Sequence, residues 1–197
     1  SAFLKLCAGR IGQLFNASNI ANELGVDYKT VQNWLSILEA GFVIYKLQPW
    51  YVNFNKRVVK SPKIYFYDTG LVCYLLGLKS KEEINLHFAK GSLFENYVLT
   101  EYIKEVWNKG GSLSSYFWRD SAGHEIDLLI ENGRKLKIVE IKSAKTIKQD
   151  FIKELGYFEK IAENYAIEKF VVYGGDEIRN QSNTKILSWN NIDQLAF

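Results

Sequence analysis

The chain has 197 residues, of which 47% are hydrophobic and 15% aromatic, and its formal net charge is +3. This composition supports a packed core and excludes wholesale disorder. No apolar run approaches the roughly 20 residues of a membrane helix, and no signal-peptide pattern is present, so we expect a cytoplasmic protein. Two cysteines and two histidines make no convincing structural zinc site. Because methionine is absent, we expect that Ser1 is not the natural first residue.

The charge is unevenly distributed. Residues 1–78 contain eight Lys or Arg and four Asp or Glu, whereas residues 79–197 contain 17 and 18. A basic part beside a near-neutral part with clustered carboxylates suggests a polyanionic partner and a metal site. The most polar stretch begins at residue 79, so we expect a module at 1–78, a linker at 79–90 and a second module at 91–197.

The first module has the pattern of helices followed by a strand pair. Spacing and capping signals predict helices at 3–15, 18–24 and 28–40, followed by strands at 42–47 and 58–67. Gly25 ends the second helix, and Asp27 caps the third. A short helix, a glycine turn and a longer helix form a helix-turn-helix pattern. The strand pair that follows makes this a predicted winged helix.

The third helix of this module is a candidate DNA-contacting element, because its outward side chains can hydrogen-bond base edges or phosphates. Those residues are Lys29, Thr30, Gln32, Asn33 and Ser36, and the strand pair adds Lys56, Arg57 and Lys60. The alternative is a packing or protein-interaction role, which winged helices often have. The absence of arginine from this helix keeps that alternative open.

The second module is predicted to follow the order helix, three strands, helix, strand. The expected ranges are 92–107, 114–118, 125–131, 135–142, 148–163 and 168–173, with a short strand at 184–188 and a small helix at 190–196. The full chain is therefore expected to be α/β (α+β overall), with a winged helix before an α/β domain.

A two-residue turn at Asn132-Gly133 is expected to join the second and third of these strands. That register sets Asp127 opposite Ile138 and Glu125 opposite Glu140. Since side chains two residues apart share a face, we predict that three residues project from one face: Asp127, Glu140 and Lys142.

Two carboxylates at this separation can share a divalent cation, and oxygen ligands favour Mg²⁺ or Mn²⁺. Like charges opposed on neighbouring strands are destabilising, so Glu125 against Glu140 calls for a bound metal or for Lys142. Glu95 continues an apolar stripe of its helix, and a carboxylate there needs a partner. We expect it at the edge of the acidic cluster.

A helix with Glu95, then Gly123-His124-Glu125-Ile126-Asp127, then Glu140-Ile141-Lys142, resembles the PD-(D/E)XK nuclease superfamily. The resemblance implies that Asp127 and Glu140 bind the metal. It also implies that Lys142 orients or activates the attacking water, or stabilises charge at the phosphate, with Glu95 as the helical acid. The implied reaction is metal-assisted hydrolysis of a phosphodiester. Asp127 lacks the preceding proline of the superfamily's name, a common variation there.

A second resemblance spans nearly the whole chain. It is carried by runs such as Asn33–Ala40, Asn53–Arg57, Lys60–Lys63, Tyr65–Leu71 and Phe117–Asp120. These look like the C-terminal region of predicted bacterial and archaeal AAA-type ATPases, a domain of unknown function. The resemblance implies an ATPase core in an absent N-terminal part, through which alone ATP would bind. No P-loop motif occurs here, so we expect no ATPase activity from this fragment.

Two functional hypotheses follow. The first is a metal-dependent, nuclease-like DNA-processing module of an AAA-type ATPase. The second is a non-catalytic DNA-binding, protein-interaction or regulatory region with a retained but inactive site. Glu125 and His124 are candidate residues around the metal ligands. For His124, a surface-turn position is the alternative to contact with phosphate or metal.

Overall fold

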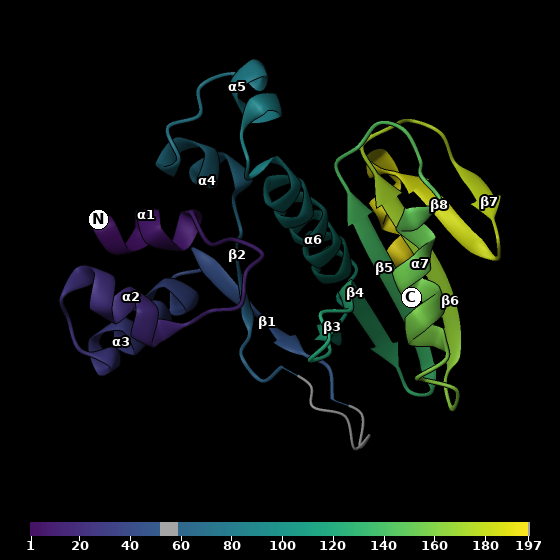
Figure 1. Cartoon of the computed structure of the whole chain (residues 1–197), viewed down its shortest axis with the longest axis horizontal. Helices are drawn as coiled ribbons and strands as arrows, with labels where there is room; N and C mark the ends of the chain where they lie inside the picture. The colour runs from purple at the N-terminus through teal and green to yellow at the C-terminus, as the bar shows by residue number, and fades with distance from the viewer. Residues whose placement is uncertain (52–58, 197) are drawn as a thin grey trace. The chain divides into compact units, whose positions relative to one another are not determined.

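The computed structural model describes residues 1–51 and 59–196 and shows a mixed α/β fold (Figure 1). The chain forms two compact units: the first is Ser1–Leu47 with Ser61–Tyr97, and the second is Gln48–Lys60 with Val98–Phe197. These units differ from the expected modules, because the stretch expected as a linker contains a helix, α5 (Lys81–Leu86), inside the first unit.

The first unit is built from three helices, a strand pair and further helices. In chain order these are α1 (Ala2–Ala8), α2 (Ala17–Leu24), α3 (Tyr28–Ala40), β1 (Ile44–Pro49), β2 (Lys63–Phe66), α4 (Thr69–Leu75), α5 and the start of α6 (Lys90–Asn108). β1 and β2 pair antiparallel, with Ile44 opposite Phe66. This is the element order that the sequence predicts for 1–67.

The helix signals predict α2 and α3 well, but they predict an α1 that is too long. The Asp27 side chain accepts the backbone N–H of Thr30 at 2.9 Å, and Gly25 ends α2 in the left-handed conformation. α1 ends at Ala8 instead of continuing to residue 15, and the chain then turns through residues 9–12, where Gly12 has φ +70°. The cap of α2 is Asn16, whereas Ser18 or Asn19 was the expected cap.

The core of the first unit lies between its helices and the strand pair. α3 contributes Val31 and Leu35, which pack with Ile20 of α2 and with Ile64 of β2. Each of these side chains is at most 1% exposed, and burying one such side chain stabilises the fold by roughly 1.5–3 kcal/mol.

The second unit contains most of an eight-stranded sheet. Its strands are β3 (Ser115–Arg119), β4 (Glu125–Asn132), β5 (Lys135–Lys142), β6 (Ala166–Tyr173), β7 (Arg179–Gln181) and β8 (Thr184–Ser188). The described strands are hydrogen-bonded in the order β2-β1-β3-β4-β5-β6-β8-β7. Helix α7 (Asp150–Glu159) contacts β4, β5 and β6 (Figure 1), and the 3-10 helix η1 (Trp189–Leu195) follows β8.

The hairpin between β4 and β5 exists, but its turn is one residue later than predicted. The last pair joins Asn132 to Lys135, so Gly133 and Arg134 form the turn. Gly133 has φ +60°, and Asn132 and Arg134 are not among the positive-φ residues. A glycine at the first central position is typical of a type II′ turn, which asks for positive φ only there.

This turn changes which residues face each other. Leu129, not Asp127, pairs with Ile138, so the predicted register is wrong. The ladder ends at the pair of Leu128 and Val139, and Asp127 and Glu140 are the next residues along the two strands. The predicted opposition of Glu125 and Glu140 lies beyond the last pair of this ladder, so it stays a prediction.

A β-bulge separates the two ends of β4. The register between β3 and β4 shifts between Tyr116 and Trp118, so Asp127 and Leu128 together stand opposite Phe117. Bulges redirect side chains and concentrate beside functional sites. The prediction for Asp127 assumed simple alternation along β4. Because of the bulge, alternation alone does not fix the direction of this side chain.

The main core of the second unit lies between the sheet and α7. It joins Phe151, Leu155 and Phe158 of α7 to buried strand residues that include Ile126, Leu129, Leu136 and Ile138. Ile126 and Leu129 are three apart yet share this cluster, which shows that alternation changes phase at the bulge. On β5, Glu140 continues the alternation of Leu136 and Ile138, so its side chain leaves the sheet on the α7 side. In the part of the chain that the structure describes, no helix has the length and apolarity to cross a membrane.

Candidate metal centre

Asp127 and Glu140 form a buried acidic pair at the open end of the β4–β5 hairpin. Their exposed fractions are 9% and 5%. The Asp127 carboxylate accepts the backbone N–H of Ile141 at 2.8 Å, which ties it to the strand that carries Glu140. The structure therefore brings together the two acids that the sequence selected.

The environment of Glu140 strongly disfavours its charge. Burial, and next the negative charge of Asp127, raise the pKa of the Glu140 carboxyl from 4.5 to about 8, with Lys142 opposing this and Glu125 adding to it. Within the described residues, Glu140 Oε2 is buried without a hydrogen-bond partner. A buried oxygen of this kind costs free energy unless something satisfies it.

Lys142 lies beside the pair, as predicted. Its ammonium group forms an ion pair with Oε1 of Glu140, while its side chain stays 38% exposed. Glu125 at the start of β4 pairs with the Arg119 guanidinium at 3.2 Å. Arg119 thus supplies compensation for Glu125 that the sequence had assigned to a metal or to Lys142.

The backbone after Lys142 is held by a glycine at the end of β6. The N–H of Gly174 donates to the carbonyls of Lys142 and Ala144, at 3.1 and 3.0 Å. A Cβ on Gly174 would lie 2.8 Å from the Ser143 carbonyl oxygen, closer than real Cβ atoms come. Close approach of backbone explains the glycine, and its position fixes the end of the strand that presents Lys142.

Glu95 has partners inside the first unit. Its carboxylate pairs with the Lys63 ammonium at 3.2 Å and accepts a hydrogen bond from the Tyr65 hydroxyl. Lys63 is 2% exposed, so each charge of this pair compensates the burial of the other. The expectation that Glu95 needs a partner is confirmed. Its assignment to the acidic cluster stays a prediction.

Two family models match the chain. One, described as "Domain of unknown function (DUF8612)", matches residues 1–82, and the other, "Domain of unknown function (DUF4143)", matches residues 90–192. The second match covers just over half of the 197 residues. The chain belongs to the DUF4143 family. The acidic pair, Lys142 and Gly174 all lie inside the DUF4143 match.

Relatives of this DUF4143 protein are known from mycobacteria. Two proteins named as uncharacterized, from Mycobacterium bovis and Mycobacterium tuberculosis, are each 33% identical to it over 135 residues. The alignment covers 68% of this chain and 30% of each relative, so the chain spans less than a third of their length in the aligned part.

The donor set of the DUF4143 region fits a hard divalent cation. Among residues 1–51 and 59–196, no group of three or more His, Cys, Asp or Glu side chains is placed to hold a metal. Two carboxylates suffice for Mg²⁺, which keeps several waters and often binds through one or two carboxylates plus substrate phosphates. The unpartnered Glu140 Oε2 is the observation that a cation between the two acids would explain.

The candidate DNA-contacting residues of the first unit form an accessible face of α3. Lys29, Asn33 and Ser36 are exposed, and Thr30 and Gln32 are partly exposed. Lys60 is exposed between β1 and β2, in the segment that belongs to the second unit. Lys56 and Arg57 lie outside the described residues.

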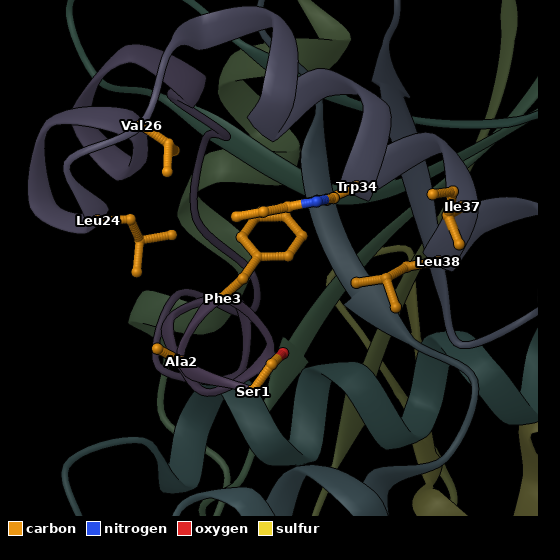
Figure 2. A pocket seen from close by; sticks show the side chains of 8 residues that line it. All are labelled: Ser1, Ala2, Phe3, Leu24, Val26, Trp34, Ile37 and Leu38. Atoms are coloured by element: carbon orange, nitrogen blue, oxygen red, sulfur yellow. The ribbon is translucent and has the colours of Figure 1, made fainter.

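An apolar pocket of about 350 Å³ lies next to this face. Figure 2 shows Trp34, Ile37 and Leu38 of α3 on one side, and Phe3, Leu24 and Val26 on the others. The Trp34 and Phe3 rings are 5.3 Å apart between centroids. Trp34 falls at helical spacing with the buried Val31 and Leu35 of α3, yet this residue is 37% exposed.

Three residues of the DUF4143 region that sequence reasoning missed surround His124. They are Asp120 in the turn before β4, and Glu154 and Tyr157 on α7. Asp120 followed by Gly123 is a turn signal that could have indicated the first. No local pattern marks the other two, because they meet His124 only through the fold. His124 directly follows this turn and is partly exposed, with its Nδ1 2.8 Å from Glu154, so the surface-turn alternative stays open and contact with phosphate or metal stays a prediction.

Proposed function

We propose that the DUF4143 region hydrolyses phosphodiester bonds of DNA with the help of a divalent metal ion. The observation that carries this proposal is the buried Asp127–Glu140 pair. The negative charge of Asp127 disfavours ionisation of Glu140, and Oε2 of Glu140 has no hydrogen-bond partner among the described residues. Two ionised carboxylates in a dry site are stabilised most simply by a cation. The resemblance to PD-(D/E)XK nucleases supports the same reading.

Asp127 and Glu140 would hold the metal, and Mg²⁺ or Mn²⁺ bound there supplies Lewis-acid polarisation of a phosphoryl oxygen. The chain's own contribution is positional. The Ile141 N–H orients Asp127, and the ion pair with Glu140 aims Lys142 at the acidic pair. A lysine ammonium there stabilises the negative charge that develops on the phosphate, or orients the attacking water.

The first unit is proposed to be a winged helix that contacts DNA. The element order α1-α2-α3-β1-β2, the cap at Asp27 and the exposed polar face of α3 support this role. The basic surplus of residues 1–78 favours a polyanionic partner. We also propose that the unit works beside an AAA-type ATPase core of the full-length protein, which would be the part that binds ATP.

A cleavage assay tests the catalytic proposal. The purified chain is incubated with plasmid, linear and branched DNA in Mg²⁺, Mn²⁺ or EDTA, in parallel with Lys142→Ala. We expect metal-dependent cleavage that falls at least a hundredfold in the variant, because one charge-stabilising group in such a site contributes about that much. Equal cleavage by the variant, or no cleavage of any substrate, refutes the proposal.

A non-catalytic role is the second candidate. The observation that favours it is the satisfied state of the charges around the pair, since Lys142 bonds Glu140 and Arg119 bonds Glu125. In that case the region would bind DNA or a protein partner through a retained site. DNA binding in EDTA together with an absence of cleavage in every metal would favour this candidate.

A further inference from the structure

The structure places a second polar cluster on the same side of the sheet as Glu140. It consists of Asp120, His124, Glu154 and Tyr157, all in the second unit. His124 alternates with Ile126, which packs against α7, and Glu140 leaves β5 toward the same helix. His124 precedes Asp127 by three residues, about 10 Å along an extended chain.

Asp120 orders the turn that carries His124. Its buried carboxylate accepts the backbone N–H groups of Ala122 and His124, at 2.9 and 3.0 Å, and the Tyr157 hydroxyl at 3.2 Å. Gly123 completes the turn with φ +95°. Because Asp120 already accepts three hydrogen bonds, its part in the cluster is to hold the loop and Tyr157 in place.

The imidazole of His124 is fixed by α7. Its ring stacks on the Tyr157 ring with 3.8 Å between centroids, and Nδ1 lies 2.8 Å from the Glu154 carboxylate. An ionised carboxylate only accepts hydrogen bonds, so Nδ1 must carry the proton. Nε2 is the nitrogen that stays available, on a side chain that is 34% exposed.

We propose that His124 is a phosphate-binding residue, held by Glu154 and Tyr157 so that Nε2–H donates to a backbone phosphate neighbouring the one hydrolysed. Glu154 lies against Nδ1 of the ring, and Glu125, the next residue in the chain, is paired with Arg119. Donation from Nε2 while Nδ1 donates to Glu154 requires the imidazolium, which carries a proton on both nitrogens. The ligand class is a nucleic-acid phosphodiester, and the inference rests on the proposed function of the region.

The chain provides an internal control, because His87 is the only other histidine. His87 Nδ1 accepts the backbone N–H of Ala89 at 3.2 Å, so its neutral ring carries the proton on Nε2. His124 should carry it on Nδ1. Nitrogen NMR of histidine-labelled protein above the histidine pKa range therefore should show two opposite tautomers, and Glu154→Gln should disturb that of His124 alone. Identical tautomers overturn the proposed clamp.

The binding step is tested with a short DNA duplex and a matched single strand in EDTA, which allows no cleavage. We expect DNA to shift the His124 signals and leave those of His87 unchanged. His124→Gln and His124→Phe should both weaken binding roughly tenfold, the loss of one charge-assisted hydrogen bond, whereas His87→Gln should not. The phenylalanine variant keeps the stacking on Tyr157, so it separates phosphate contact from packing.

The outcomes distinguish this inference from the proposed hydrolysis. If DNA shifts His124 and the variants bind weakly but no metal supports cleavage, the phosphate contact stands and hydrolysis fails. If the wild type cleaves DNA and both His124 variants bind and cleave as well as the wild type, hydrolysis stands and the phosphate contact is overturned. Absence of any DNA binding overturns it also.

Discussion

Glu140 is the residue whose surroundings demand an explanation beyond the fold. It lies close enough to Asp127 of the neighbouring strand to feel its charge, is 5% exposed, and has one oxygen without a partner among the described residues. Packing alone would favour an apolar side chain in such a position. Ile138, two residues earlier on the same strand, is an example. A residue kept at this cost is a functional-site candidate, because perturbed pKa values concentrate where chemistry occurs.

The raised pKa of Glu140 gives the metal-free protein a specific pH dependence. Between 4.5, its ordinary value, and about 8 in the fold, the folded state binds more protons than the unfolded state. The free energy of unfolding should therefore fall as pH rises through this window. The loss is about 1.4 kcal/mol for each tenfold difference in proton affinity between the folded and unfolded states. Urea unfolding in EDTA from pH 5 to 9 measures this.

Glu140→Gln should abolish most of that dependence, whereas Glu163→Gln, an exposed control, should keep it. Added Mn²⁺ should also flatten it for the wild type, because the cation compensates the ionised carboxylate. A wild-type protein as stable in EDTA at pH 9 as at pH 5 would contradict this account of Glu140.

At the scale of single elements, the strand that presents Glu140 and Lys142 is locked by the end of β6. The contact of Gly174 with Ser143 leaves no room for a Cβ. Gly156 is a contrasting case, because it lies inside α7 and a Cβ there would meet nothing within 4 Å. The same substitution at these two glycines should therefore have opposite effects.

Gly174→Ala should lower the melting temperature, because the backbone must move to relieve the close approach. Gly156→Ala should raise it, since alanine in a helix interior is roughly 0.5–1 kcal/mol better than glycine. Thermal unfolding of the two variants beside the wild type measures both. A neutral Gly174→Ala would show that the loop after Lys142 is held by something else.

Local signals predicted most elements, and non-local contacts explain where they failed. The cap at Asp27 and the glycine at the end of α2 fixed α2 and α3 correctly. The turn at Gly133-Arg134 was misplaced because Asn132-Gly133 favours a type I′ turn, whereas the chain uses only the glycine at positive φ. The bulge at Asp127 arises from the pairing of β4 with β3, so the sequence of β4 alone did not predict it. Asp127 and Glu140 were nevertheless placed near each other, because moving the turn by one residue shifts each pairing by only two positions.

At the scale of the whole molecule, we propose that DNA contact falls on the exposed polar face of α3 in the first unit. Lys29→Ala combined with Asn33→Ala should weaken DNA binding and reduce its salt dependence by about one phosphate contact. Lys81→Ala removes the same charge from α5, an exposed position of the same unit. Affinities measured from low to moderate salt compare them. Equal losses for both variants would reduce the role of α3 to non-specific charge.

Direct measurement of Mn²⁺ binding tests the central claim, the cation between Asp127 and Glu140. Calorimetric titration of the wild type should reveal one site, which Asp127→Asn and Glu140→Gln each remove and Glu163→Gln leaves intact. Binding should strengthen as pH rises toward 8, because Glu140 must lose its proton to bind the ion. Mn²⁺ affinity that is absent in the wild type, or equal in all four proteins, would contradict the proposed metal centre.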